Sequence, residues 1–139
     1  LKSRREAIKS GCVLTTPFGR KRRFPYVTSQ MLNTYQNEAC NFAIQSVASD
    51  FTLLTGIRIQ PQLKRFGASI VNLVHDSLIV ELPKDREIAE HLFKWVPEQM
   101  GVTPAQWFDL PFKFVADATI GTHWGRLYGS VAEAFESCR

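Results

Sequence analysis

The stretch SIVNLVHDSLIVEL, residues 69–82, decides the expected fold. Residues 69–74 and 78–82 are rich in β-branched and aliphatic side chains, as is typical of strands buried on both faces. The polar residues HDS at 75–77 lie between these two runs, and short polar segments of this kind favour a tight turn. The stretch therefore predicts a β-hairpin with buried arms and a polar tip.

The segments on both sides of this hairpin predict an α+β fold. Residues 33–56 carry apolar side chains at spacings of three and four, which is the period of an amphipathic helix. Residues 85–96 repeat this pattern until Pro97, so we expect a second helix there and a loop over 97–111. Residues 112–120 alternate apolar and polar side chains, which predicts a strand with one buried face. This order of elements predicts an antiparallel sheet with helices packed on one face.

Length and composition predict a single domain. The chain has 139 residues, of which 45% are apolar and 22% are charged, and this is the balance of an ordinary globular protein. A chain of this length can bury roughly two thirds of its unfolded surface without a metal or a disulfide. We expect four parts: a basic helix end and hairpin at 1–26, a long helix at 33–56, the central hairpin at 69–82, and a helix with a final strand at 85–124.

The cysteines and the hydropathy pattern bear on the compartment. Cys12, Cys40 and Cys138 are odd in number and widely spaced, so they fit neither a disulfide framework nor a Cys-x-x-Cys zinc site. No apolar run approaches the ~18 residues that a membrane span needs, and the basic start lacks the apolar stretch of a signal peptide. We therefore expect a cytoplasmic protein without a membrane partner.

Positive charge is concentrated at the start of the chain. Residues 1–26 hold eight basic residues and one acidic residue, a net charge of +7, whereas the other 113 residues carry −3 and the whole chain carries +4. Such a concentration of charge is typical of a surface that meets a polyanion. It also fits a solvated turn or a localisation signal, because basic runs are common in all three settings.

Local patterns predict the structure of this basic segment. Residues 1–10 are expected to form the end of a helix that Gly11 terminates. Residues 12–16 and 23–27 are β-prone and flank a Pro-Phe-Gly sequence, so they predict a hairpin with a basic cluster at or near its turn. The members of this basic cluster are Arg20, Lys21, Arg22 and Arg23.

Two sets of polar residues are candidates for a functional site. Asp76, at the tip of a rigid hairpin, suits a ligand of a hard cation such as Mg²⁺, although Asp and Ser77 also form ordinary turns. His75 can be a structural histidine or half of a His-Asp dyad. Asn41 and Gln45 lie one turn apart on the polar face of the first long helix, where amides can pair with base edges or face solvent.

Three motifs together resemble the family A DNA polymerases, the family of bacterial DNA polymerase I and many phage replicative enzymes. LVHDSLIVE at 73–81 is similar to the third catalytic motif of that family. GCVLTTPFGRKRRFP at 11–25 resembles its Gly-Tyr-Val-x-Thr…Gly-Arg-Arg…Pro hairpin, and EACNFAIQSVASD at 38–50 resembles its palm helix with Asn-x-x-x-Gln-Gly-x-Ala-x-Asp. The motifs follow in the family's order, and the resemblance runs from about residue 1 to about residue 124. The chain thus resembles the C-terminal palm portion of such an enzyme.

The resemblance implies a DNA-directed DNA polymerase that adds deoxynucleotides from their triphosphates to a primer 3′ end. Asp76 would be one of two carboxylates that hold two Mg²⁺ ions, and the other carboxylate would lie on the upstream portion. His75, Asn41 and Gln45 would contact the minor groove of the primer-template DNA, which offers acceptors at every correct base pair. The basic cluster would hold the duplex backbone.

Two family motifs are absent from the sequence, and two residues depart from the family's pattern. The first motif, Asp-Tyr-Ser-x-x-Glu, supplies the other metal-binding Asp, and the second supplies the Lys and Tyr that receive the nucleotide. Ser77 stands where Glu is usual, and Ser46 stands where Gly is usual. We therefore expect the chain alone not to polymerise DNA. We expect a split enzyme, in a bacterium or a phage-infected host, whose second polypeptide carries the fingers and the upstream palm.

Two other functions stay open from the sequence. A non-catalytic remnant of a polymerase would keep the basic hairpin for nucleic-acid binding after losing the chemistry, and Ser77 fits such a loss. A hydrolase would use the pair His75 and Asp76, but neither a Gly-x-Ser-x-Gly elbow nor another suitable nucleophile accompanies that pair.

Overall fold

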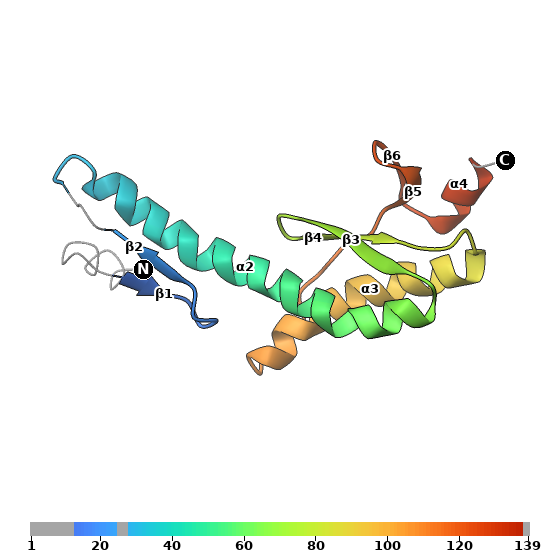
Figure 1. Cartoon of the computed structure of the whole chain (residues 1–139), viewed down its shortest axis with the longest axis horizontal. Coiled ribbons are helices and arrows are strands. Elements are labelled where there is room, and N and C mark those ends of the chain that lie inside the picture. Colours follow the sequence, from blue (N-terminus) through green and yellow to red (C-terminus); the bar gives the residue numbers. More distant parts are fainter. Residues whose placement is uncertain (1–12, 25–27, 138–139) are drawn as a thin grey trace. The chain divides into compact units, whose positions relative to one another are not determined.

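The computed structural model describes residues 13–24 and 28–137 as helices joined to short antiparallel strands (Figure 1). The strands are β1 (Val13–Thr15), β2 (Lys21–Arg23), β3 (Ser69–Val74), β4 (Ser77–Glu81), β5 (Ile120–His123) and β6 (Arg126–Tyr128). The helices are α2 (Leu32–Arg65), α3 (Arg86–Trp107) and α4 (Val131–Glu136). The expected α+β class is confirmed, and the helix end expected over 1–10 lies outside the described residues.

The chain forms two compact units, and the boundary between them falls after Asp50, inside α2. In the first unit the hairpin β1–β2 packs on α2. Phe24 and Ala39 are 3% and 0% exposed and form the centre of this contact. The ring of Tyr35 lies 5.4 Å from the ring of Phe24, and the partly buried Leu14 and Leu32 complete the cluster. This small apolar contact holds the hairpin on its helix.

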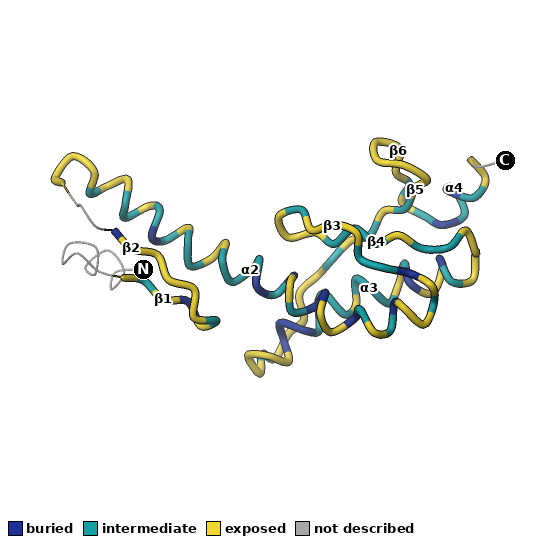
Figure 2. The backbone as a smooth tube through the Cα atoms, in the orientation of Figure 1, coloured by how far each residue is buried: buried dark blue, intermediate teal, exposed yellow. Residues whose placement is uncertain are grey.

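The second unit contains the larger core. The hairpin β3–β4 packs with the later part of α2 and with α3, and Figure 2 shows buried stretches on both helices. Arg58 on α2 also donates to the side-chain oxygen of Gln106 on α3 over 2.6 Å. The fully packed residues of this core are Ile59, Leu63, Ala68 and Leu92. The central hairpin therefore stands on a rigid base.

The strands pair in three separate antiparallel hairpins, β1–β2, β3–β4 and β5–β6, within the part of the chain that the structure describes. The central hairpin was predicted correctly. Its register runs from Ser69 opposite Glu81 to Val74 opposite Ser77, with one irregularity in β3 between Ile70 and Asn72.

Helix α2 is longer than the sequence predicts. We expected it to end at Gly56, but it continues through Pro61 to Arg65. Gly56 is buried, and a Cβ atom there would touch Ile70 and Leu78 at 3.4 and 3.5 Å, so this glycine packs against the hairpin instead of ending the helix. The chain leaves the helix after Arg65 through Gly67, whose positive φ of 69° allows two terminal bonds: Gly67 N–H to the Lys64 carbonyl and Ala68 N–H to the Leu63 carbonyl. No helix among the described residues is long and apolar enough to cross a membrane.

Helix α3 does not end at Pro97, and the loop expected over 97–111 is wrong for most of its length. The helix continues through Pro97 and Pro104 to Trp107, although each proline removes a backbone donor. Gly101, Thr103, Pro104 and Ala105 near its end are buried, and Gly101 accepts a bond from Phe114 N–H at 3.2 Å. This tertiary contact stabilises the helix beyond the point where the local signal predicts its end.

The strand expected over 112–120 is also wrong, because only Ile120 of that range belongs to a strand. Residues 112–119 have no strand partner among the described residues. Phe112, Phe114 and Val115 are 55%, 46% and 92% exposed, so the alternating pattern does not produce a buried face. A strand needs a neighbour to satisfy its backbone groups, and the alternation by itself does not provide one.

Candidate functional site

The turn of the central hairpin presents Asp76 to solvent. β3 and β4 pair as far as Val74 and Ser77, so His75 and Asp76 alone connect the two strands. His75 has a φ of 55°, in the left-handed region that two-residue hairpin loops require at their first position. Histidine is among the few residues enriched there. Both turn residues are exposed, and Asp76 is held at the tip of a short connection.

A buried threonine supports this turn from below. The hydroxyl of Thr52 on α2 donates to the backbone carbonyl of Asp76 over 3.2 Å. Thr52 is 6% exposed, so this bond connects the packed interior of the second unit to the exposed tip. Thr52 was not among the predicted site residues, since nothing in the local sequence indicates that a turn 24 residues later lies beside it. A polar residue in a well-packed part of a helix was the only signal.

The turn offers one side chain, Asp76, that can be a ligand of a metal ion. A carboxylate is a preferred ligand of hard cations such as Mg²⁺, and Asp76 is exposed enough to reach one. The described residues contain no group of three or more His, Cys, Asp or Glu side chains that could hold a metal ion. Asp76 can therefore be one ligand of such an ion.

The basic cluster lies mostly on a strand. β2 comprises Lys21–Arg23, and it pairs with β1 from Thr15 opposite Lys21 to Val13 opposite Arg23. The connection is closed by Thr16 N–H to the carbonyl of Arg20 at 2.9 Å and by Arg20 N–H to the Thr16 hydroxyl at 3.1 Å. The strand begins two residues earlier than the β-prone run predicted over 23–27, of which 25–27 lie outside the described residues.

Two arginines of the cluster form ion pairs with acids on α2. Arg20 Nε lies 2.7 Å from Asp50 Oδ1, and an Arg22 guanidinium nitrogen lies 2.6 Å from Glu38 Oε2. The side chain of Asp50 is 10% exposed, and its Oδ2 atom has no hydrogen-bond partner among the described residues. The sequence did not predict these pairs, because 30 and 16 residues separate the partners.

The structure brings three of the predicted DNA-binding residues to one groove. Arg22, Asn41 and Gln45 line a hollow of about 230 Å³ in the first unit, with Glu38, Phe42 and Ser46. Asn41 and Gln45 are exposed, as their place on the polar face of the helix predicts. The groove therefore offers two amides and a paired guanidinium side by side.

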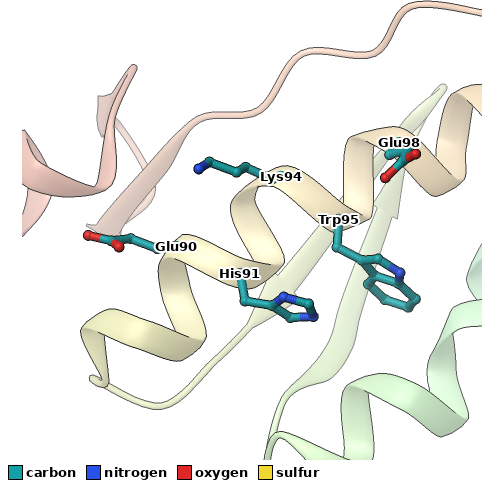
Figure 3. Close-up of a pocket in the computed structure, with 5 residues that line it drawn as sticks. All are labelled: Glu90, His91, Lys94, Trp95 and Glu98. Atoms are coloured by element: carbon teal, nitrogen blue, oxygen red, sulfur yellow. The ribbon is translucent and has the colours of Figure 1, made fainter.

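A second hollow lies on α3 and contains none of the predicted residues. Figure 3 shows its lining, which comes from five residues of that single helix: Glu90, His91, Lys94, Trp95 and Glu98. The rings of His91 and Trp95 stack at 6.4 Å with an angle of 13° between their planes, and Phe66 contacts His91 at 5.0 Å. Phe66 and Trp95 pack against the core, so we assign the hollow no part in the site.

Comparison with known proteins identifies the family. The sequence model described as DNA polymerase family A matches residues 1–126. The chain belongs to DNA polymerase family A. This match confirms the resemblance of the chain to that family, and it ends at Arg126, the first residue of β6.

Several family A relatives are similar over most of this chain. It is 32% identical to the thermostable DNA polymerase I of Thermus aquaticus over 127 residues, 88% of this chain and 14% of the relative. It is 32% identical to the thermostable DNA polymerase I of Thermus filiformis over 113 residues, 78% of this chain and 13% of the relative. It is 29% identical to the DNA polymerase of Bacillus phage SP01 in an alignment 143 residues long, which covers 96% of this chain and 15% of the relative. The chain thus spans about one seventh of the length of these polymerases.

Proposed function

We propose that this chain is the C-terminal palm portion of a DNA-directed DNA polymerase that extends a primer 3′ end with deoxynucleotides. One observation carries this proposal: the exposed carboxylate of Asp76 stands on a two-residue turn whose strands are packed into the core of the second unit. A metal ligand must be held in place and still reach the ion. Membership of family A supports primer-template DNA and deoxynucleoside triphosphates as the substrates.

Asp76 would hold Mg²⁺ together with a carboxylate from the upstream portion of the polymerase. Two Mg²⁺ ions bound there would activate the primer hydroxyl and neutralise charge at the transferred phosphoryl group. Asp76 contributes a fixed negative charge, and Thr52 restrains the backbone behind it. Ser77 contributes only a neutral hydroxyl at the position where the family usually has Glu. The turn therefore depends on Asp76 for its charged oxygen donors.

The polar side chains of both units would contact the duplex. Asn41 and Gln45 are exposed amides whose N–H groups can donate to acceptors in the minor groove, and His75 can donate from a ring nitrogen. Those acceptors occur at every correct base pair, so such contacts test the geometry of a pair without reading its sequence. The basic cluster would add contacts to phosphate, which give affinity and orientation.

The chain alone should not polymerise DNA. A two-metal site needs more than one charged ligand, and no group of three metal-binding side chains exists within the described residues. We infer that the Asp-Tyr-Ser-x-x-Glu motif and the nucleotide-binding motif come from another part of the enzyme, carried by a second polypeptide.

Reconstitution tests this proposal. The chain is mixed with a polypeptide that carries the upstream palm and fingers of the same polymerase, and extension of a labelled primer is measured with Mg²⁺ and deoxynucleoside triphosphates. Extension is expected from the mixture and from neither polypeptide alone. A mixture that associates and binds the duplex without extending the primer would contradict the proposal. Extension by this chain alone would contradict the need for a second polypeptide.

A non-catalytic nucleic-acid-binding remnant is the second candidate, and Ser77 is the observation that favours it. Replacement of an acid by a hydroxyl removes a charged donor from the metal-binding turn. This candidate predicts that the complete assembly binds duplex DNA with full affinity and that replacing Asp76 changes no activity.

A further inference from the structure

Strand geometry divides the basic cluster into two faces. Successive side chains of a strand point to opposite sides, so Arg20, Arg22 and Phe24 form one set, and Lys21 and Arg23 form the other. Phe24 is 3% exposed and packs with Ala39 of α2, which fixes the first set as the face toward the helix. The second set therefore points away from α2.

The charges on the inner face are balanced within the first unit. Arg20 pairs with Asp50 at 2.7 Å and Arg22 pairs with Glu38 at 2.6 Å. The Arg22 guanidinium also lies 5.5 Å from the centre of the Phe24 ring, so its position is fixed by a ring as well as by an acid. Each of these arginines would have to break its ion pair before it could contact a phosphate group closely.

The charges on the outer face are not balanced. Lys21 and Arg23 are exposed, and neither has an ion pair within the described part of the chain. Their Cα atoms lie two residues apart on one strand, a separation of about 6.6 Å. A short strand with two exposed cations on the same side complements the phosphate groups of a nucleic-acid backbone.

We propose that Lys21 and Arg23 contact the DNA backbone, whereas Arg20 and Arg22 are positioning residues that fix β2 on α2 through Asp50 and Glu38. This inference rests on the proposed duplex binding and states which half of the cluster performs it. The cluster then contributes two phosphate contacts, not the four that its composition predicts.

The salt dependence of duplex binding tests the division. The dissociation constant of the complete polymerase for primer-template DNA is measured from about 50 to about 200 mM salt for the wild type and four single variants, in which each member of the cluster is replaced by Gln. Each phosphate contact contributes about 0.9 to the slope of log K against log salt concentration. Lys21→Gln and Arg23→Gln are each expected to reduce the slope by about 0.9. Arg22→Gln removes the same charge one residue away and serves as the matched control. Arg22→Gln and Arg20→Gln are each expected to reduce the slope by less than half as much.

A further variant, Glu38→Gln, is expected to change the salt slope in the opposite direction. Glu38→Gln frees Arg22 without removing a cation, so the slope should become steeper by up to about 0.9. Glu38 is 39% exposed, so this change should leave the fold intact, and circular dichroism checks the fold of every variant. Equal reductions for all four Gln variants, or an unchanged slope for both Lys21→Gln and Arg23→Gln, would overturn the division. A wild-type polymerase that does not bind the duplex would instead refute the proposed function.

Discussion

Replacement of Thr52 by Val removes the bond that supports the turn carrying Asp76. Valine has nearly the shape of threonine and a similar helix propensity, so the change removes the hydroxyl and little else. The lost bond is the one from the Thr52 hydroxyl to the Asp76 carbonyl, 3.2 Å long. A neutral bond of this kind contributes about 1 kcal/mol. The carbonyl belongs to an exposed turn residue and can accept from water instead, so the cost should not exceed that value.

Hydrogen exchange at the backbone amides of residues 74–78 measures this effect directly. A loss of about 1 kcal/mol lowers the free energy of local opening, and protection of these amides should fall by about fivefold. Amides in the core, such as that of Leu63, should keep their protection, because the change affects the turn and not the packing of the second unit.

Thr55→Val is the matched control. Thr55 is also buried, at 1% exposure, but its hydroxyl donates over 2.8 Å to the carbonyl of Phe51 in its own helix. The control removes the same chemical group without touching the turn, so the turn should keep its protection. Equal loss of protection at residues 74–78 in both variants, or no loss in Thr52→Val, would refute the view that Thr52 supports Asp76.

Two further changes test the packing of each unit by chemical denaturation. Arg20→Gln leaves the buried carboxylate of Asp50 without its cation and should destabilise the first unit by about 1–3 kcal/mol. This cost is below the 3–5 kcal/mol of a fully buried pair because the Arg20 side chain is 48% exposed. An additional Asp50→Asn change should recover part of the lost stability, and no recovery would contradict the pairing. Gly101→Ala places a Cβ atom against the backbone oxygen of Phe114, closer than van der Waals contact, and should destabilise the second unit by about 1–3 kcal/mol. Gly129→Ala is its control, since a Cβ atom there meets nothing within 4 Å; equal stability of the two variants would contradict the contact.

The sequence predicts those parts of the fold whose signals are local. The central hairpin is visible because two apolar runs flank a polar turn, and its observed strands agree with the prediction within one residue. The predicted ends of α2 and α3 were wrong, because packing overrides the local signals there. Pro97 does not end α3, because residues near Gly101 are buried and bonded to the segment that follows.

The candidate site was predictable in its residue types and not in its connections. Asp76 and the amides on α2 were found from motifs and helical spacing, because both depend on neighbours in the sequence. Thr52 below the turn and the acids opposite Arg20 and Arg22 depend on contacts between residues 16 to 30 positions apart. All four residues of the basic cluster looked equivalent in the sequence. Their two faces are distinguished by the packing of β2 on α2.

Single-turnover primer extension by the Asp76→Asn variant of the complete polymerase tests the central claim most directly. The variant keeps the shape of the side chain and removes the charge that would hold Mg²⁺, and Asp117→Asn removes an exposed carboxylate of the same unit as a control. We expect the rate of incorporation to fall by more than about 100-fold in Asp76→Asn, because loss of even the outer partners of metal ligands costs 10- to 100-fold. Duplex affinity should be retained in both variants, and Asp117→Asn should extend the primer normally. Extension by Asp76→Asn at the wild-type rate would contradict the assignment of Asp76 as a catalytic metal ligand.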